Sequence, residues 1–219
     1  FEIKNNIKTI DDNAFTSSGL TSLTTPSTIE TINSNVFSSC TNLLELNYPT
    51  KAIIVNPNIF TGCQQLTKLT IIGDENESSS IPDYEKDKQP WFAIRDRIST
   101  IILNGKIETI GNYAFEGTSI KSIDLTGIVT IGNYSFSNTQ LERLIIPTTV
   151  TTTKTQSFSN CDKLISVEFP ISISSHTNDL FVGSDKIETL IINGTGEMKP
   201  YETNEEQPWY IIRNKNIQT

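Results

Sequence analysis

The 219-residue sequence predicts a β-rich solenoid, a stack of short coils that bury apolar side chains against one another. The first observation is a recurring phenylalanine, with spacings of 22, 23, 55, 21, 22 and 23 residues between Phe15, Phe37, Phe60, Phe115, Phe136, Phe158 and Phe181. The second is that an aliphatic residue or alanine stands eight positions before each of these phenylalanines. Abundant Ser, Thr, Asn and Ile, with 36% hydrophobic residues, favour strands joined by polar turns.

Each repeat contains the same elements in the same order. Aliphatic residues that alternate after the phenylalanine, such as Leu141, Leu144 and Ile146, predict a short strand with one buried face. Pro147 follows and cannot extend the ladder of a sheet, so it ends this strand. Within residues 111–115, the Gly-Asn pair indicates a turn and the Ala-Phe pair a tight helical or 3₁₀ turn. Since no coil can bury its apolar face alone, we expect stability to come from stacking.

The unit L-x-x-I-x-I-P-x-x-V-x-x-I-G-x-x-A-F-x-x-C resembles the BspA-like leucine-rich repeat. The resemblance covers essentially the whole chain and is close at residues 111–115 and 132–136. It implies a right-handed, curved leucine-rich-repeat solenoid with a parallel sheet on the concave side. It also implies a surface protein that adheres to or binds host matrix proteins. The repeat departs from the pattern at Ala52, Thr153 and His176, where we expect local irregularity.

Two enlarged coils interrupt the array, at residues 73–97 and 194–216. The sequence of residues 89–95, QPWFAIR, recurs at residues 207–213 as QPWYIIR. Each copy follows an acidic stretch, and residues 73–90 and 194–208 together carry most of the formal net charge of −8. We interpret residues 1–219 as a single repeat array, a fragment of a longer one.

Two interpretations of each enlarged coil remain open. The acidic stretch is either a solvated loop or a weak Ca²⁺ site at Asp74, Glu75 and Glu77. Trp91 and Trp209 either plug the enlarged coil or stack on a ligand. We expect Arg95 and Arg213 to pair with nearby acids or to stack on those rings.

The composition argues against several classes of function. An acidic chain lacks the excess of Lys and Arg that nucleic acids and anionic membranes require. No apolar run approaches the roughly 18 residues of a transmembrane helix. Cys40, Cys63 and Cys161 share a repeat position with Ser and Thr, which predicts free, buried thiols. With His176 as the single histidine, we expect no metal, no cofactor and no catalytic residues, so the sequence predicts a protein that is not an enzyme.

Sequons for N-glycosylation begin at Asn76, Asn133 and Asn193. Asn76 and Asn193 lie in or beside the acidic loops and are the candidates for a glycan in a secreted eukaryotic protein. Asn133 occupies the turn before a repeat phenylalanine, where a structural role is expected.

Side chains alternate between the faces of a strand, so one column of the predicted sheet points outward. Its members towards the C-terminal half are Ile102, Asp124, Ile145, Glu168 and Ile191, and Arg143 stands in the neighbouring column. Exposed isoleucines among charges suit protein recognition. The alternative is that β-branched residues simply favour strands.

We therefore predict a non-enzymatic, protein-binding repeat module of a cell-surface or secreted adhesin. Its partner would be a host matrix or cell-surface protein, or neighbouring repeats of the same chain or assembly. The alternative is a structural array, such as a stalk, filament or scaffold, without a dedicated ligand. A hydrolase hidden in the acidic loops is the least favoured hypothesis.

Overall fold

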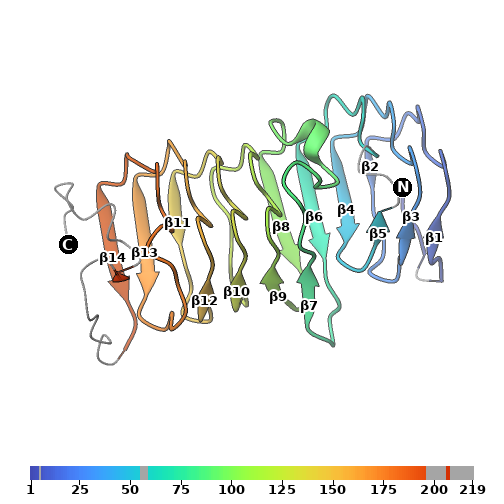
Figure 1. The fold of residues 1–219 in the computed structure, drawn as a ribbon. Helices are drawn as coiled ribbons and strands as arrows, with labels where there is room; N and C mark the ends of the chain where they lie inside the picture. The colour runs from blue at the N-terminus through green and yellow to red at the C-terminus, as the bar shows by residue number, and fades with distance from the viewer. Residues whose placement is uncertain (5, 55–58, 196–205, 208–219) are drawn as a thin grey trace. The chain divides into compact units, whose positions relative to one another are not determined.

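The computed structural model describes residues 1–4, 6–54, 59–195 and 206–207. The chain divides into two compact units, Phe1–Ser80 with Glu85–Ile107, and Ile81–Tyr84 with Glu108–Thr219. Each unit is a parallel β-solenoid with almost no helix, which confirms the predicted class of fold (Figure 1). Within the described residues, no helix has the length and apolarity needed to cross a bilayer.

Each coil of the first unit contributes short strands to two parallel sheets (Figure 1). One sheet has the order β2-β4-β6-β8, formed by Ser22–Leu23, Glu45–Pro49, Lys68–Ile72 and Thr100–Asn104. The other has the order β1-β3-β5, formed by Thr9–Ile10, Thr31–Ile32 and Ile53–Ile54. The first sheet contains the predicted strand of each repeat. The second was not predicted as a sheet, although its residues include the aliphatic position five before the phenylalanine.

The second unit repeats this arrangement. Four of the predicted site residues belong to its sheet β11-β13-β14, formed by Arg143–Ile145, Ser166–Pro170 and Thr189–Asn193. In its other sheet, β10 at Thr130–Ile131 pairs with β12 at Thr152–Thr153 and with β9 at Ile107–Ile110. β7 at Ser79–Ile81 lies at the residue boundary between the two units. Thr153 is buried and pairs with Ile131, so this departure from the repeat still occupies a core position.

The repeat phenylalanines stack on one another inside each unit. Ring centroids are 5.9 Å apart for Phe15 and Phe37 and 5.4 Å apart for Phe37 and Phe60. In the second unit the distances are 5.6, 5.3 and 5.8 Å along the series Phe115, Phe136, Phe158 and Phe181. Apart from Phe15, all of these rings are buried. Stacked aromatic rings contribute about 0.5–1.5 kcal/mol per pair beyond the area that they bury.

The turns around these phenylalanines are not the helical or 3₁₀ turns that the sequence suggested. Among the described residues, one 3₁₀ helix is longer than a single residue. This is η1 at Phe92–Ile94, and it lies in the first enlarged coil. In five repeats the residues two before and two after the phenylalanine both have positive φ, namely Asn13 and Ser17, Asn35 and Ser39, Tyr113 and Gly117, Tyr134 and Asn138, and Gln156 and Asn160. This conformation lets alternate N–H groups donate to the next coil, as from Phe115 to Ser135 at 2.8 Å and from Gly117 to Ser137 at 2.9 Å.

The position of β5 differs from the sequence alignment by one residue. Ile10 and Ile32 stand five residues before Phe15 and Phe37, and the same count from Phe60 gives Val55. The structure instead pairs Ile54 with Ile32. Val55 itself lies outside the described residues. The spacing between Phe37 and Phe60 contains one residue more than that between Phe15 and Phe37, and this residue falls after β5 rather than before it.

Replacing Gly132 with alanine is expected to lower the free energy of unfolding by about 1–3 kcal/mol. A Cβ at this position would lie 2.6 Å from the carbonyl carbon of Gly111 in the adjacent coil, so the backbone of one coil would have to move. Urea unfolding followed by circular dichroism measures the change. The matched control is Gly19→Ala, where a Cβ meets nothing within 4 Å and the expected change is within about 0.5 kcal/mol. Equal effects of the two substitutions would contradict the close coil contact.

Candidate functional site

The strands β11, β13 and β14 bring four of the predicted site residues together. Their register places Ile145 beside Glu168 and Glu168 beside Ile191. The side chains between these positions point inward, since Leu144, Val167 and Leu190 are buried. Ile145 and Ile191 are 47% and 43% exposed, so the outward column predicted for these three strands is present.

An ion pair joins this column to the neighbouring one. The guanidinium of Arg143 donates to the carboxylate of Glu168, which belongs to the next strand of the sheet. The Glu168 side chain is only 17% exposed, whereas that of Arg143 is 61% exposed. The sheet therefore presents a covered carboxylate, an accessible guanidinium and two accessible isoleucines. We call Arg143, Ile145, Glu168 and Ile191 the outer face of the second unit.

The other two predicted site residues do not join this outer face. Ile102 is 43% exposed, but it lies on β8 in the first unit, where it pairs with Thr70. Asp124 is exposed in the second unit but lies outside the described strands. Its carboxylate accepts hydrogen bonds from the hydroxyl and the backbone N–H of Thr126, at 2.6 and 2.9 Å. These bonds lower the pKa of Asp124 and direct its carboxylate to its own turn.

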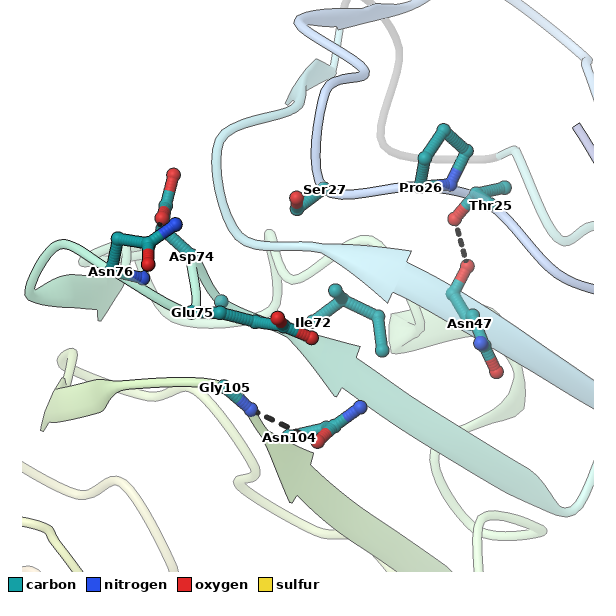
Figure 2. Close-up of a pocket in the computed structure, with 11 residues that line it drawn as sticks. Thr25, Pro26, Ser27, Asn47, Ile72, Asp74, Glu75, Asn76, Asn104 and Gly105 are labelled. Atoms are coloured by element: carbon teal, nitrogen blue, oxygen red, sulfur yellow. Dashed lines mark hydrogen bonds between the residues drawn. The ribbon is translucent and has the colours of Figure 1, made fainter. Parts of the chain in front are cut away.

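Sequence reasoning did not single out a polar hollow in the first unit. It has a volume of about 410 Å³ and lies near the carboxyl ends of β6 and β8 (Figure 2). Its lining includes Thr25, Pro26 and Ser27 from one coil, Asn47 from β4, Ile72 from β6, residues 73–76 from the first acidic loop, and Asn104 and Gly105. We call this the polar hollow. The repeat pattern does not reveal it, because its residues come from four consecutive coils and follow no common motif.

Asp74 is held at the rim of the polar hollow by three donors. Its carboxylate accepts hydrogen bonds from the backbone N–H of Asn76 and Glu77, at 2.9 and 3.3 Å, and pairs with the Lys51 ammonium at 3.0 Å. The bond from Asn76, then Lys51, then the bond from Glu77, lower the pKa of Asp74 to about 2. Among the described residues, no three His, Cys, Asp or Glu side chains form a set that could hold a metal ion. In this structure, Asp74, Glu75 and Glu77 are not gathered into such a set.

The backbone fixes this acidic loop against the following coil. Lys106 donates its N–H to the carbonyl of Asp74 at 2.7 Å, and the N–H of Asp74 donates to the Ser79 hydroxyl at 2.8 Å. Gly105 has φ +82°, and a Cβ there would lie 2.7 Å from the carbonyl oxygen of Gly73. The hollow is therefore built on a closely packed base rather than on an isolated loop.

Trp91 in the first enlarged coil belongs to the core. It is fully buried and packs edge-on against Tyr48, with ring centroids 5.7 Å apart, as expected for a plug. Arg95 pairs with Asp87 at 2.7 Å, one of the two predicted kinds of contact, and lies 4.5 Å over the ring of Phe92, a ring that the prediction did not name. Trp209 and Arg213, in the second enlarged coil, lie outside the described residues.

The cysteines and the histidine occupy buried or half-buried positions. All three thiols are free and buried, as predicted. The thiols act as donors between coils, since Cys40 and Cys63 donate to the carbonyls of Phe15 and Phe37 at 2.9 and 3.0 Å. Burial raises the pKa of Cys63 to about 12. His176 is half-buried, and burial lowers its pKa.

The three sequons differ in their surroundings. Asn76 and Asn193 are exposed, at the rim of the polar hollow and at the end of β14. Asn133 is half-buried, and its N–H donates to the side chain of Asn112 in the preceding coil at 2.8 Å. This contact agrees with the structural role expected for Asn133.

The BspA-type leucine-rich repeat region matches residues 1–84 and 88–201 of this chain, in 6 copies. The chain belongs to this family. The BspA-type repeats include both sheets of each unit and the predicted binding positions. They make the chain a repeat module, of a kind that generally mediates protein interactions. No curated protein sequence matches the chain.

Three solved structures resemble these BspA-type repeats at low sequence identity. A leucine-rich cell surface protein from Faecalibacterium prausnitzii is 15% identical, with a TM-score of 0.47, covering 89% of this chain and 59% of its own. A leucine-rich repeat protein from Bacteroides ovatus is 19% identical, with a TM-score of 0.42, covering 85% and 59%. The pneumococcal vaccine antigen PcpA is 16% identical, with a TM-score of 0.40, covering 91% and 69%. The chain thus spans less than two thirds of the length of the first two.

Replacing Lys51 with methionine is expected to raise the pKa of Asp74, because it removes one of the three donors to this carboxylate. The pKa should stay below the ordinary value of about 3.9, since the N–H groups of Asn76 and Glu77 still donate. Any stability that this carboxylate contributes is present above about pH 4 and is lost as the pH falls towards about 2. Carboxyl titration by NMR measures the pKa.

Lys68→Met is the control, because Lys68 forms a comparable exposed ion pair with Glu45 on the same unit. It should leave the Asp74 titration unchanged. An unaltered Asp74 pKa in the Lys51 variant would show that the ammonium does not hold this carboxylate in solution.

Proposed function

We propose that this chain is a non-enzymatic protein-binding module of a cell-surface or secreted protein, and that it contacts a host or matrix protein through the outer face of the second unit. The observation that supports the proposal is the pair of exposed isoleucines, Ile145 and Ile191, on either side of Glu168 across three register-paired strands. The family to which the repeats belong supports a role in protein interaction.

The outer face combines features that reduce the entropic cost of binding. Its strands are held by parallel pairing and by buried neighbours, so the backbone is ordered before a partner arrives. Isoleucine is branched at Cβ and has few accessible χ1 rotamers, so its side chain loses little freedom on contact. The two isoleucines lie on the coils that flank the coil of Glu168, and they would give a partner two fixed apolar contacts.

Charge would select among partners. The carboxylate of Glu168 is largely covered and is already paired, so it offers little to a partner directly. The guanidinium of Arg143 remains accessible and carries donors beyond those used by Glu168. A partner with an apolar centre and a carboxylate beside it would match this arrangement.

Ile145→Asp is expected to abolish partner binding while leaving the melting temperature nearly unchanged, because the side chain is exposed and makes no core contact on the inward face of β11. Burying a new carboxylate against an apolar partner surface is costly unless that charge is paired. The measurement is binding of the purified chain to immobilised fibronectin and other matrix proteins, by surface plasmon resonance.

Thr148→Asp introduces the same charge at an exposed position outside β11 and should bind like the wild type. Unchanged binding of the Ile145 variant would eliminate the outer face as the contact surface. Failure of the wild-type chain to bind any matrix protein would eliminate this class of partner.

A second candidate function is a structural array whose coils pair end to end. The observation that favours it is an apolar hollow of about 520 Å³ on the first coil, lined in part by Phe1, Ile3, Ile7 and Phe15. Phe1 and Ile7 are 67% and 40% exposed, and the ring of Phe1 packs edge-on against Phe15 at 5.9 Å. A further coil stacked on this surface would bury these side chains, as every internal coil does.

If this second role holds, sedimentation velocity at increasing protein concentration will show self-association, and Ile7→Asp will weaken it. The Ile145→Asp variant is the matched control, because it places the same charge on an exposed isoleucine of the outer face. A monomer at all concentrations, with or without the substitution, would contradict end-to-end pairing through this hollow.

A further inference from the structure

The polar hollow of the first unit contains hydrogen-bonding groups that the protein itself does not use. Within the described part of the chain, the side chains of Ser27, Asn47, Glu75 and Asn76 have no hydrogen-bond or ion-pair partner. Asn104 uses its side-chain oxygen to accept from the N–H of Gly105 at 3.0 Å, which leaves its amide nitrogen available. Figure 2 shows these groups around the side chain of Ile72, with Glu75 extending towards it.

These groups comprise both donors and acceptors. A hydroxyl of Ser27 and the side-chain amides of Asn47 and Asn76 can do either, the carboxylate of Glu75 accepts, and the free nitrogen of Asn104 donates. A sugar hydroxyl also donates and accepts at the same time, so it can use such a mixed set fully. We propose that the polar hollow binds a short, neutral saccharide.

The size and the remaining lining of the hollow agree with this class of ligand. A volume of about 410 Å³ lies within the range of about 300–1,000 Å³ that small-molecule sites occupy. Ile72 and Pro26 are half-buried and supply a limited apolar surface at the base and side. The C–H face of a sugar ring would lie against these two side chains while its hydroxyls reach the polar groups.

Charge favours a neutral ligand over an acidic one. The carboxylate of Glu75 is unpaired and points into the hollow, while the Lys51 ammonium at its rim is already paired with Asp74. An acidic sugar would therefore meet a free carboxylate, and Lys51 would not offset it without leaving Asp74. Its binding would carry an electrostatic penalty that a neutral sugar avoids.

The site is ordered before the ligand arrives. Asp74 holds the turn that carries Glu75 and Asn76, through bonds to the N–H of Asn76 and Glu77. Thr25 donates to the carbonyl of Asn47 at 2.5 Å and ties the opposite side of the hollow to β4. Because these contacts already exist, little loop ordering opposes binding. The polar hollow lies in the first unit, and its ligand is independent of the partner proposed for the outer face of the second unit.

The test is an NMR titration of the whole chain, produced in bacteria so that Asn76 carries no glycan. The probes are the methyl glycosides of glucose, galactose, mannose, fucose, N-acetylglucosamine and N-acetylgalactosamine, together with glucuronic acid. At least one neutral glycoside should shift the amide signals of Gly73, Asn76 and Gly105. Glucuronic acid should bind more weakly than its neutral counterpart, and Glu75→Gln should reduce this difference.

Glu75→Gln and Asn47→Ala should each weaken binding of the responding glycoside by about tenfold. Among the described residues, neither side chain makes a hydrogen bond or an ion pair, so both variants should melt close to the wild type. Asn193→Ala is the matched control, since Asn193 ends β14 as Asn104 ends β8, and it should bind normally. The proposal is overturned if no neutral glycoside shifts these amides, or if the two variants bind as tightly as the wild type.

Discussion

The fold depends on one constraint, the stacking of each coil on the next in a fixed register. The phenylalanine rings, the parallel strand pairs and the thiol or hydroxyl donors all repeat at the same interval, so each reinforces the alignment of the others. Ser184 donates to the carbonyl of Phe158 at 2.7 Å just as Cys161 donates to that of Phe136 at 3.3 Å. A coil shifted by one residue would lose all three kinds of contact together, and this cooperation specifies the outward columns.

The class of fold and the inward positions could be predicted because buried positions recur at a fixed spacing along the chain, and apolar residues occupy them. The turns were misjudged for a physical reason. Positive φ at Tyr113 or Tyr134 is unusual for an aromatic residue, and it is imposed here by hydrogen bonds to the next coil rather than by local preference. The register of β5 was also ambiguous, since a single additional residue in a repeat can be placed on either side of a two-residue strand.

The two candidate surfaces differ in how far the sequence could reveal them. Side chains alternate between the two faces of a strand, so the sequence could predict that Ile145, Glu168 and Ile191 share the outer face. The sequence also placed Asp124 and Ile102 in this column, but Asp124 lies outside the strands and Ile102 belongs to the first unit. The polar hollow could not be predicted in this way, because its shape depends on how the first acidic loop folds against the neighbouring coils. The charge of Asp74 alone suggested an ion ligand. In the structure, its carboxylate accepts a hydrogen bond from the N–H of Asn76 in its own turn and pairs with Lys51. Sequence indicates which charges are close along the chain but not which donors reach them.

The close approach of Gly132 to Gly111 also bears on how such arrays change in length. Where two backbones touch without an intervening side chain, an inserted residue has no space, and every coil beyond it would be displaced. The first enlarged coil leaves the repeat after the carboxyl end of β6 and the chain returns to the sheet at β8, so additional chain is accommodated there. Insertions and deletions should therefore collect at this single point of the repeat. New pockets would then arise beside the sheet while the stack itself stays intact.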